Sequence, residues 1–399
     1  MSEPASLNPA QMEAVHHLGG PCLVLAGAGS GKTRVITHKI ARLLQAGYAP
    51  GQIAAITFTN KAAAEMRERV GHLVGPVVKA MWVSTFHSAC VRILRRDAQL
   101  LGYPSAFTIY DQADAVRLTS YVLRDLNIDP KRFPPRSVHA AISAAKNDGL
   151  SAQDYLERAS VIHERRIGEV FEEYQARLLK AGAMDFDDLL SVTVDLLRSQ
   201  PQVLEHYRRR FGNVLVDEYQ DTNPVQARLI ELLSERAELV VVGDDDQAIY
   251  GWRGADVAQI LEFPQHHPGC QLIRLEQNYR STGHILTCAD AIIRRNRGRL
   301  GKELWSELGD GHPVKVRQLQ DEHHEARVVV EQILDGITED IPPHEIAVFY
   351  RTHAQSRVIE EALAGSAIRY AIYGGLGFFE RREIRDLLAY LRLLTNPAS

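Results

Sequence analysis

The sequence predicts an α/β protein: a parallel-sheet domain with a phosphate-binding P-loop and a helical insertion, followed by an incomplete second sheet domain. Two observations support this prediction. Short apolar segments of strand length alternate with amphipathic segments of helix length, a pattern typical of parallel sheets. A glycine-rich stretch, AGAGSGKT at 26–33, separates the first such strand from the first such helix.

The first sheet domain is predicted from four apolar segments. They are residues 21–25 (PCLVL), 53–58 (IAAITF), 213–216 (NVLV) and 238–244 (ELVVVGD). A helix is expected to follow the glycine-rich stretch, because RVITHKIARLLQ has apolar side chains at helical spacing.

Residues 89–208 differ from their surroundings. They have few strand signals and are interrupted by Pro104, Pro130, Pro134 and Pro135. A helical insertion is therefore expected here. The α/β pattern resumes near residue 278, with strands expected at the segments VKVRQL, EIAVFY and IRYAIY.

The predicted domains follow from this division. The first sheet domain, which carries the glycine-rich stretch, comprises 1–88 and 209–277, the helical insertion comprises 89–208, and a partial second sheet domain comprises 278–399.

The composition excludes several classes of protein. The chain has 399 residues, 45% of them hydrophobic, and a net charge of −4, so a DNA site would have to be a local groove. Its four cysteines form no CxxC pair, which argues against a zinc ribbon or a disulfide framework. The first residues contain no apolar signal segment, and no run approaches membrane-spanning length, so a cytoplasmic protein is expected.

The glycine-rich stretch has the chemistry of a phosphate site. Its glycines allow successive backbone N–H groups to face phosphate oxygens at a helix N-terminus. Lys32 can reach the β- and γ-phosphates of ATP, and the Thr33 hydroxyl can hold Mg²⁺. The predicted nucleotide-binding residues of this stretch are Ala26, Gly27, Ala28, Gly29, Ser30, Gly31, Lys32 and Thr33, with alanine where the pattern has its first glycine.

An acidic pair follows the predicted strand at 213–216. A carboxylate at the carboxyl end of such a strand can bind Mg²⁺ beside the nucleotide, and we assign this role to Asp217. The neighbouring Glu218 is predicted to position or deprotonate the attacking water.

Further segments complete an ordered set. ITFTNKAAAEM (56–66), STFHSAC (84–90), VDEYQD (216–221), VVGDDDQAIYGWRGA (241–255) and LEQNYRST (275–282) follow AGAGSGKT, and GGLGFFERREIRDLLAYL (374–391) comes after them. This set resembles the motifs of superfamily 1 DNA helicases of the UvrD/PcrA/Rep family over essentially the whole chain. The resemblance implies two RecA-like domains.

The resemblance implies roles at the nucleotide. Gln11 resembles the glutamine that reads adenine, and Tyr279 resembles the aromatic that stacks on it. Arg34 resembles a residue near the nucleotide. Gln247 resembles the γ-phosphate sensor, and Arg280 resembles an arginine finger that braces the transferring phosphoryl group.

The resemblance also implies a DNA track. Phe58, Tyr250 and Trp252 match aromatics on which bases stack, and Thr59, Asn60 and Arg253 match residues that contact the DNA backbone. Core packing is the alternative for each aromatic. Tyr250 and Trp252 nevertheless lie in a glycine-flanked loop that offers little helix or strand to bury them.

Three other features have weaker interpretations. His353 stands where many relatives have asparagine, so no DNA contact is assigned to it. DFDDLL (185–190) recurs in the family and is explained by an acidic helix start capped by Asp185. The basic run RRNRGRLGK (294–302) could contact DNA phosphates, but the pattern favours a solvated helix end.

The expected function is an ATP-dependent 3′→5′ DNA helicase or single-stranded-DNA translocase of repair or replication, nucleoid-associated in a bacterium. It would use ATP and Mg²⁺ and bind single-stranded DNA and single-strand/double-strand junctions. Later family motifs have no counterpart here, so an N-terminal portion that hydrolyses ATP poorly and does not unwind duplex is expected. The alternatives are a small-molecule P-loop kinase, the motor subunit of a helicase–nuclease complex, and a non-catalytic binding module.

Overall fold

The computed structural model describes residues 7–373 and 386–391. Contacts between residues divide the chain into two compact units, the first running to His312 and the second from Pro313 to Tyr390. None of the described helices combines the length and the apolar character needed to cross a membrane.

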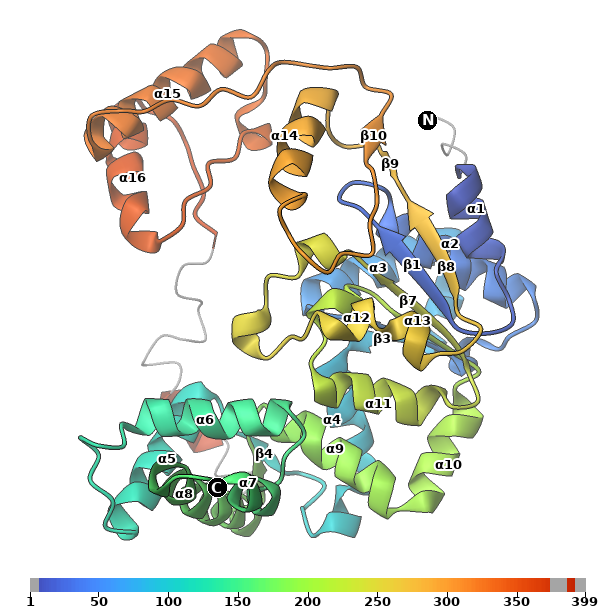
Figure 1. Ribbon diagram of the computed structural model, residues 1–399, viewed down its shortest axis with the longest axis vertical. Coiled ribbons are helices and arrows are strands. Elements are labelled where there is room, and N and C mark those ends of the chain that lie inside the picture. Colours follow the sequence, from blue (N-terminus) through green and yellow to red (C-terminus); the bar gives the residue numbers. More distant parts are fainter. Residues whose placement is uncertain (1–6, 374–385, 392–399) are drawn as a thin grey trace. The chain divides into compact units, whose positions relative to one another are not determined.

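A six-stranded parallel sheet forms the centre of the first unit (Figure 1). In spatial order its strands are β3 (Trp82–Thr85), β2 (Ile53–Thr57), β6 (Asn213–Val216), β7 (Glu238–Gly243), β1 (Cys22–Ala26) and β8 (Gln271–Leu275). The four predicted strands are confirmed, and so is their parallel pairing. The two edge strands, β3 and β8, were not predicted from the sequence.

Helices cover both faces of this sheet, which explains why its inner strands are almost entirely buried and mostly apolar. One face packs on α1 (Pro9–His16), α2 (Lys32–Gln45) and α3 (Asn60–Val74). The other face packs on α4 (Phe86–Asp97), α9 (Asp188–Ser199), α10 (Pro201–Arg210) and α11 (Pro224–Ser234).

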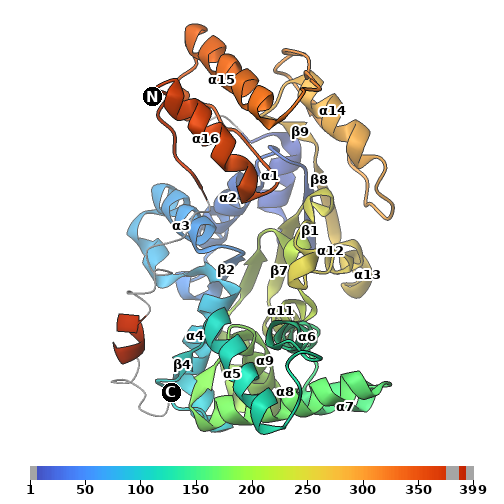
Figure 2. The same cartoon turned by 90° about the vertical axis from the view of Figure 1, so that its left-hand side faces the viewer.

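A helical layer with its own core extends from the second face (Figure 2). It comprises α5 (Gln112–Asp125), α6 (Pro135–Asn147), α7 (Ala152–Arg158) and α8 (Ile162–Lys180), with a short parallel pair of β4 (Thr108–Ile109) and β5 (Ala183–Met184). Residues 89–208 are thus mostly helical, as expected. The helices at both ends of this range share the core of the sheet, whereas those in its middle share a separate core.

Short elements follow β7. They are α12 (Ala258–Leu261), α13 (Phe263–His266), α14 (Gly283–Ile293) and the parallel pair of β9 (Gln277–Asn278) and β10 (Trp305–Ser306). Contacts with the first sheet place residues 278–306 in the first unit, although the predicted domain boundary fell at 278. The assignment of three domains stays a prediction.

The second unit contains α15 (Glu322–Thr338) and α16 (Ser356–Gly365), which pack through a small core of Val330, Ile333 and Leu363. The strands predicted at 314–319, 345–350 and 368–373 are wrong, because none of these residues is in a strand. A strand needs a hydrogen-bonded partner, and here both Val316 and Phe349 are 93% exposed. Residues 374–385 of the last quoted motif lie outside the described residues.

Candidate nucleotide site and nucleic-acid groove

The predicted site residues gather at one edge of the sheet. The P-loop follows β1, the acidic pair follows β6, and the loop with Gln247 and Trp252 follows β7. These three strands are adjacent in the order β6-β7-β1, and all are parallel. Their carboxyl ends therefore meet, which is where parallel sheets bind ligands.

The P-loop has the backbone shape that phosphate binding requires. Gly29 and Gly31 have φ values of 68° and 87°, in a region where a side chain would be strained. The Ser30 hydroxyl donates to the Gly27 carbonyl over 2.7 Å and tightens the turn. Helix α2 begins at Lys32, so its free N–H groups and the positive end of its dipole point to this loop.

The P-loop lysine is paired with the second acidic residue. Lys32 Nζ lies 3.0 Å from Glu218 Oε2, and the lysine side chain is only 12% exposed. Glu218 has a φ of 52°, in the left-handed region, which costs of order 1–3 kcal/mol for a non-glycine residue. Such backbone strain is concentrated at functional sites, which is consistent with the role predicted for Glu218.

The first acidic residue is buried and poorly neutralised. Burial, and then the charge of Glu218, raise the pKa of Asp217 to about 7. Its side chain accepts a hydrogen bond from the Glu218 backbone N–H at 3.0 Å, and none of the ion pairs among the described residues includes it. A buried carboxylate without a cationic partner fits a Mg²⁺ ligand, as predicted for Asp217 together with Thr33 at the start of α2.

Asn278 joins a distant segment to the P-loop, and the sequence analysis gave it no role. Its side-chain amide donates to the Ala28 carbonyl, and its oxygen accepts from the backbone N–H groups of Arg280 and Ser281 at 2.8 and 2.7 Å. The Tyr279 N–H donates to the Gly29 carbonyl at 2.9 Å. A Cβ added to Gly29 would lie 2.8 Å from Arg280 Cβ, so the predicted arginine finger starts beside the P-loop.

The residues predicted to hold adenine also lie together. Gln11 is buried, and its amide donates to the Ser30 carbonyl at 2.9 Å. The Asn8 side chain caps α1 by accepting from the Gln11 N–H at 2.8 Å, and its amide donates to the Tyr279 hydroxyl at 2.9 Å. Tyr279 is 44% exposed, so one face of its ring can receive a base. Arg34 lies on the first turn of α2, with its Cβ 3.8 Å from a Cβ added to Gly31.

A buried glutamine connects the acidic pair to the next loop. Gln220 donates to Glu218 Oε2 at 2.8 Å, and its side-chain oxygen accepts from the Asp244 N–H at 2.9 Å. Asp244 in turn accepts from the Gln247 amide. Lys32 and Gln247 are therefore connected through three intermediate residues, and Gln220 was missed because an isolated glutamine carries no sequence signal.

Beside the nucleotide site, a groove of about 1180 Å³ runs between the sheet edge and the helical layer. All the residues predicted to contact DNA line it, namely Phe58, Thr59, Asn60, Tyr250, Trp252 and Arg253. Thr59 also caps α3, and Asn60 accepts from the hydroxyls of Thr85 and Ser88 over 3.4 Å.

The aromatic side chains form a row along this groove. Phe58 and Tyr250 are stacked with ring centroids 5.0 Å apart, and Trp252 follows at 6.4 Å from Tyr250. The Arg253 guanidinium lies 4.5 Å from the Trp252 ring centroid. Trp252 is 74% exposed, so the alternative of core packing is wrong for this residue.

A second aromatic pair also lines the groove and was not predicted from the sequence. His87 and Phe186 are stacked with ring centroids 3.9 Å apart, and Phe186 is 57% exposed. Burial lowers the pKa of His87 to about 4, so its ring is neutral near pH 7. The available signal was an apolar aromatic between acidic residues in DFDDLL.

The helix-capping explanation of DFDDLL is incomplete. Asp185 does accept from the Asp188 N–H at 2.8 Å. Both carboxylates are buried, however, and each lies 2.7 Å from Nζ of the buried Lys146. The Tyr174 hydroxyl also donates to Asp185 at 2.8 Å. The motif therefore holds the base of the Phe186 loop through a buried ion-pair network.

The interpretation of the basic run 294–302 as a solvated helix end is wrong for two of its residues. Helix α14 ends at Ile293, before the run begins. Arg299 makes a bidentate pair with Asp246 at 2.6 and 2.7 Å, and Lys302 is buried against the same acidic loop. These two cations are neutralised by protein carboxylates and are not available to DNA phosphates.

Comparisons with known proteins identify the family of this chain. Residues 7–268 match the family model of the UvrD/REP helicase N-terminal domain, and residues 273–399 match that of the UvrD-like helicase C-terminal domain.

Curated relatives are similar over nearly the whole chain. The ATP-dependent DNA helicase PcrA of Bacillus subtilis (strain 168) is 47% identical over 396 residues, which cover 98% of this chain and 54% of that protein. The ATP-dependent DNA helicase UvrD1 of Mycobacterium tuberculosis (strain ATCC 25618 / H37Rv) is 50% identical over 406 residues, covering 98% and 52%. The chain spans about half the length of the curated relatives it matches. This chain belongs to the UvrD/REP helicase family.

Proposed function

We propose that the chain is the ATP-driven part of a 3′→5′ DNA helicase or single-stranded-DNA translocase. The observation that supports this most directly is the loop after β7. Within seven residues it contains Gln247, hydrogen-bonded to the acidic side of the nucleotide site, and Arg253 at the far end of the aromatic row. These seven consecutive residues therefore connect the phosphate side of the nucleotide site directly to the groove, so a conformational change at one site would be transmitted to the other.

The proposed substrate of the first site is ATP. Its phosphates would lie on the P-loop N–H groups and Lys32, its adenine beside Gln11 and Tyr279, and its Mg²⁺ on Thr33 and Asp217. The ion supplies charge neutralisation on the phosphates when bound. Glu218 then orients the attacking water, and Arg280 braces the transferring phosphoryl group.

The proposed ligand of the groove is single-stranded DNA, including the single-stranded arm of a junction. Bases would stack on Phe58, Tyr250 and Trp252, which tolerates any sequence because every base has a π-face. A stack of two aromatics with a third close by, next to exposed Arg253, has the chemistry of such a track. The polarity is proposed from the family resemblance.

The proposed domain division places the six groove residues and most of the nucleotide residues in one domain. The ATP-binding domain comprises 1–88 and 209–277, the helical insertion 89–208, and the partial second domain 278–399. A separate apolar core supports a distinct insertion in the middle of 89–208, whereas the helices at both ends of this range share the core of the sheet.

One experiment tests this function. ATP hydrolysis is measured with and without a poly-dT oligonucleotide, for the wild type and for Lys32→Ala and Trp252→Ala. DNA-stimulated hydrolysis that needs Lys32, with a stimulation midpoint that shifts to higher DNA concentration in Trp252→Ala, supports the proposal. ATP hydrolysis that is not stimulated by DNA, with unchanged DNA affinity in Trp252→Ala, favours a P-loop enzyme of another class.

A further inference from the structure

The acidic loop after β7 concentrates negative charge. One carboxylate oxygen from each of Asp244, Asp245 and Asp246 lies within 4.8 Å of the other two, and Asp244 and Asp245 are buried. Three carboxylates this close repel one another strongly unless cations neutralise them. The loop therefore cannot hold its shape without a counter-charge.

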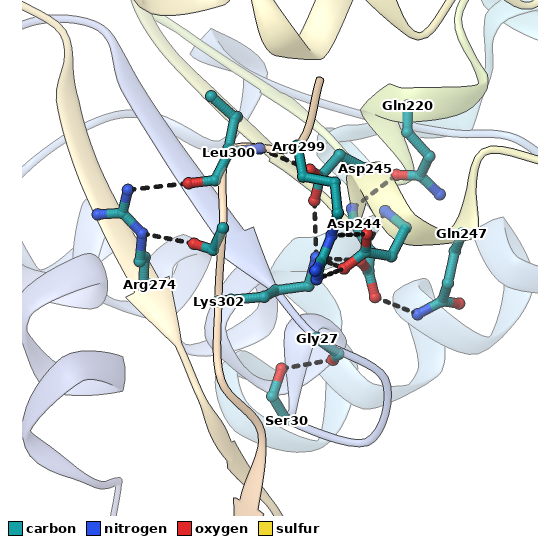
Figure 3. A network of polar contacts seen from close by, with 12 residues as sticks. Gly27, Ser30, Gln220, Asp244, Asp245, Gln247, Arg274, Arg299, Leu300 and Lys302 are labelled. Atoms are coloured by element: carbon teal, nitrogen blue, oxygen red, sulfur yellow. Dashed lines mark hydrogen bonds and ion pairs between the residues drawn. The ribbon is translucent and has the colours of Figure 1, made fainter. Parts of the chain in front are cut away.

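Lys302 supplies that counter-charge from 56 to 58 residues further along the chain. Its side chain is 2% exposed, and its Nζ lies 2.7 Å from Asp244 and 2.6 Å from Asp245, and also pairs with Asp246. Figure 3 shows the Lys302 side chain extending toward the carboxylates from a separate segment of the chain. Because the ammonium occupies the position where a metal ion would bind, we read this cluster as an internal ion-pair site and not as a metal site.

The segment that carries Lys302 is fixed at several points, and we call residues 299–304 the basic segment. Arg299 pairs with Asp246, and the Leu300 N–H donates to Asp245 at 2.9 Å. Arg274 of β8 donates to the carbonyls of Leu300 and Gly301 (Figure 3). A Cβ added to Gly27 would lie 2.2 Å from a Leu304 methyl, so the basic segment also passes against the P-loop.

The acidic loop is joined to the nucleotide site through Asp244. Asp244 accepts from the Gln247 amide, and its backbone N–H donates to Gln220, which donates to Glu218. If Asp244 were displaced by repulsion from its neighbours, Gln247 would lose its anchor. Glu218 would at the same time lose the far end of its hydrogen-bonded chain.

We propose that Lys302 is a positioning residue for ATP turnover. By neutralising Asp244, Asp245 and Asp246, it keeps the Gln247 side chain in position beside the phosphates. This inference rests on the proposed function. The basic segment thereby links residues that follow the first sheet to the γ-phosphate side of the nucleotide site. In this role Lys302 does not contact the nucleotide and acts only through the acidic loop.

The test compares ATP affinity with turnover. Lys302→Met removes the charge and keeps most of the volume, Lys302→Arg keeps the charge, and Arg297→Met is the matched control. Arg297 is exposed on the same stretch of chain. Nucleotide binding is measured by calorimetry, phosphate release by single-turnover assay, and folding by thermal melting.

Lys302→Met is expected to bind ATP nearly as well as the wild type, while turnover falls about 10²-fold, the size of a misplaced catalytic group. Lys302→Arg should recover most of this loss, and Arg297→Met should match the wild type. In a cycle with Gln247→Ala, the double variant should lose no more than Gln247→Ala alone, because both changes remove one interaction. Should Lys302→Met fail to fold, Lys302→Gln carries the same test.

Wild-type turnover in Lys302→Met, or full additivity with Gln247→Ala, overturns the role of Lys302 and leaves the proposed function standing. Failure of the proposed function itself would give a different result. If the wild type binds no ATP and Lys32→Ala changes nothing, the proposed function fails, and the role of Lys302 fails with it.

Discussion

Lys32 Nζ lies 3.0 Å from Glu218 Oε2, which joins the P-loop to the acidic pair after β6 by an ion pair. Glu218 is also bound by Gln220, so it keeps one partner when Lys32 turns to a phosphate. The ion pair therefore orients both side chains, and Lys32 can still leave Glu218 to bind a phosphate.

Lys32→Ala is expected to abolish ATP hydrolysis while the protein stays folded. The lysine supplies charge to the β- and γ-phosphates and contributes little packing. Glu218 is 35% exposed and retains Gln220, so the lost pair should cost little stability. Phosphate release and thermal melting are measured together, with Lys79→Ala, an exposed lysine remote from the P-loop, as the control. Hydrolysis at the wild-type rate would contradict the assignment of this loop.

Trp252→Ala is expected to weaken single-stranded-DNA binding by about 1–3 kcal/mol, the value of one lost base stack. The ring is 74% exposed in the groove, so its removal should leave the melting temperature nearly unchanged. Fluorescence titration with poly-dT measures the affinity. Tyr121→Ala removes an aromatic that is 46% exposed and does not line the groove, and should have no effect. Equal losses in both variants would mean that the groove is not the binding site.

Lys146→Met is expected to destabilise the protein by about 3–5 kcal/mol, the usual cost of removing one partner from a buried ion pair. Lys146 is 3% exposed and lies 2.7 Å from both Asp185 and Asp188, which would be left as two uncompensated buried carboxylates. Urea unfolding measures the loss. Lys180→Met, at an exposed position on α8, is the control and should change the free energy of unfolding by less than about 0.5 kcal/mol.

The same network predicts a pH dependence. One lysine cannot neutralise two buried carboxylates, and burial, followed by the charge of Asp185, raises the pKa of Asp188 to about 7. A carboxyl whose pKa is higher in the folded state than in the unfolded state favours folding while it is protonated. Its contribution is full below the unfolded pKa near 4 and is lost as the pH rises to about 7.

The stability of the wild type relative to Asp188→Asn should therefore fall as the pH rises from about 4 to about 7. Urea unfolding of both proteins at several pH values in this window measures the difference. Asp154→Asn, at a surface carboxyl whose pKa is lowered by its hydrogen bonds with Ser151, should show no such fall. A difference between wild type and Asp188→Asn that is constant with pH would mean that Asp188 is ionised throughout.

The sheet domain, and the place of the candidate nucleotide residues at the carboxyl ends of its strands, could be predicted from the sequence because their signals are local. The strand, glycine loop and helix from Cys22 to Gln45 are contiguous, and the predicted elements match the observed ones there. Predicted strands after residue 313 failed, because apolar alternation shows only that a segment could form a strand. Pairing depends on partners that the segment itself does not specify.

The missed residues share a different cause. Asn278, Gln220 and Lys302 act through partners that are distant in sequence, so spacing could not reveal them. Lys302 was misread because a basic run after a helix is usually solvated. The clue was available in the three consecutive aspartates of GDDDQ, since buried carboxylates must find cations somewhere in the fold.

The last prediction concerns Arg280. Its backbone N–H is fixed by Asn278, and its Cβ lies beside Gly29, so its guanidinium starts from the rim of the P-loop. Its side chain is exposed and free to reach a phosphate. An arginine that braces the transferring phosphoryl group acts on developing charge, so it should affect turnover far more than ATP affinity.

Arg280→Ala is expected to lower ATP turnover by about 10³–10⁵-fold. Arg280→Lys should rescue little of this, because an ammonium cannot reproduce the two-pronged contact of a guanidinium with phosphate oxygens. Single-turnover phosphate release and calorimetric ATP binding separate the two effects, and Arg295→Ala, an exposed arginine after α14, serves as the control. A parallel loss of affinity and turnover would make Arg280 a ground-state phosphate ligand. Unchanged turnover would remove it from the site, and Asn278 would then be positioning the P-loop alone.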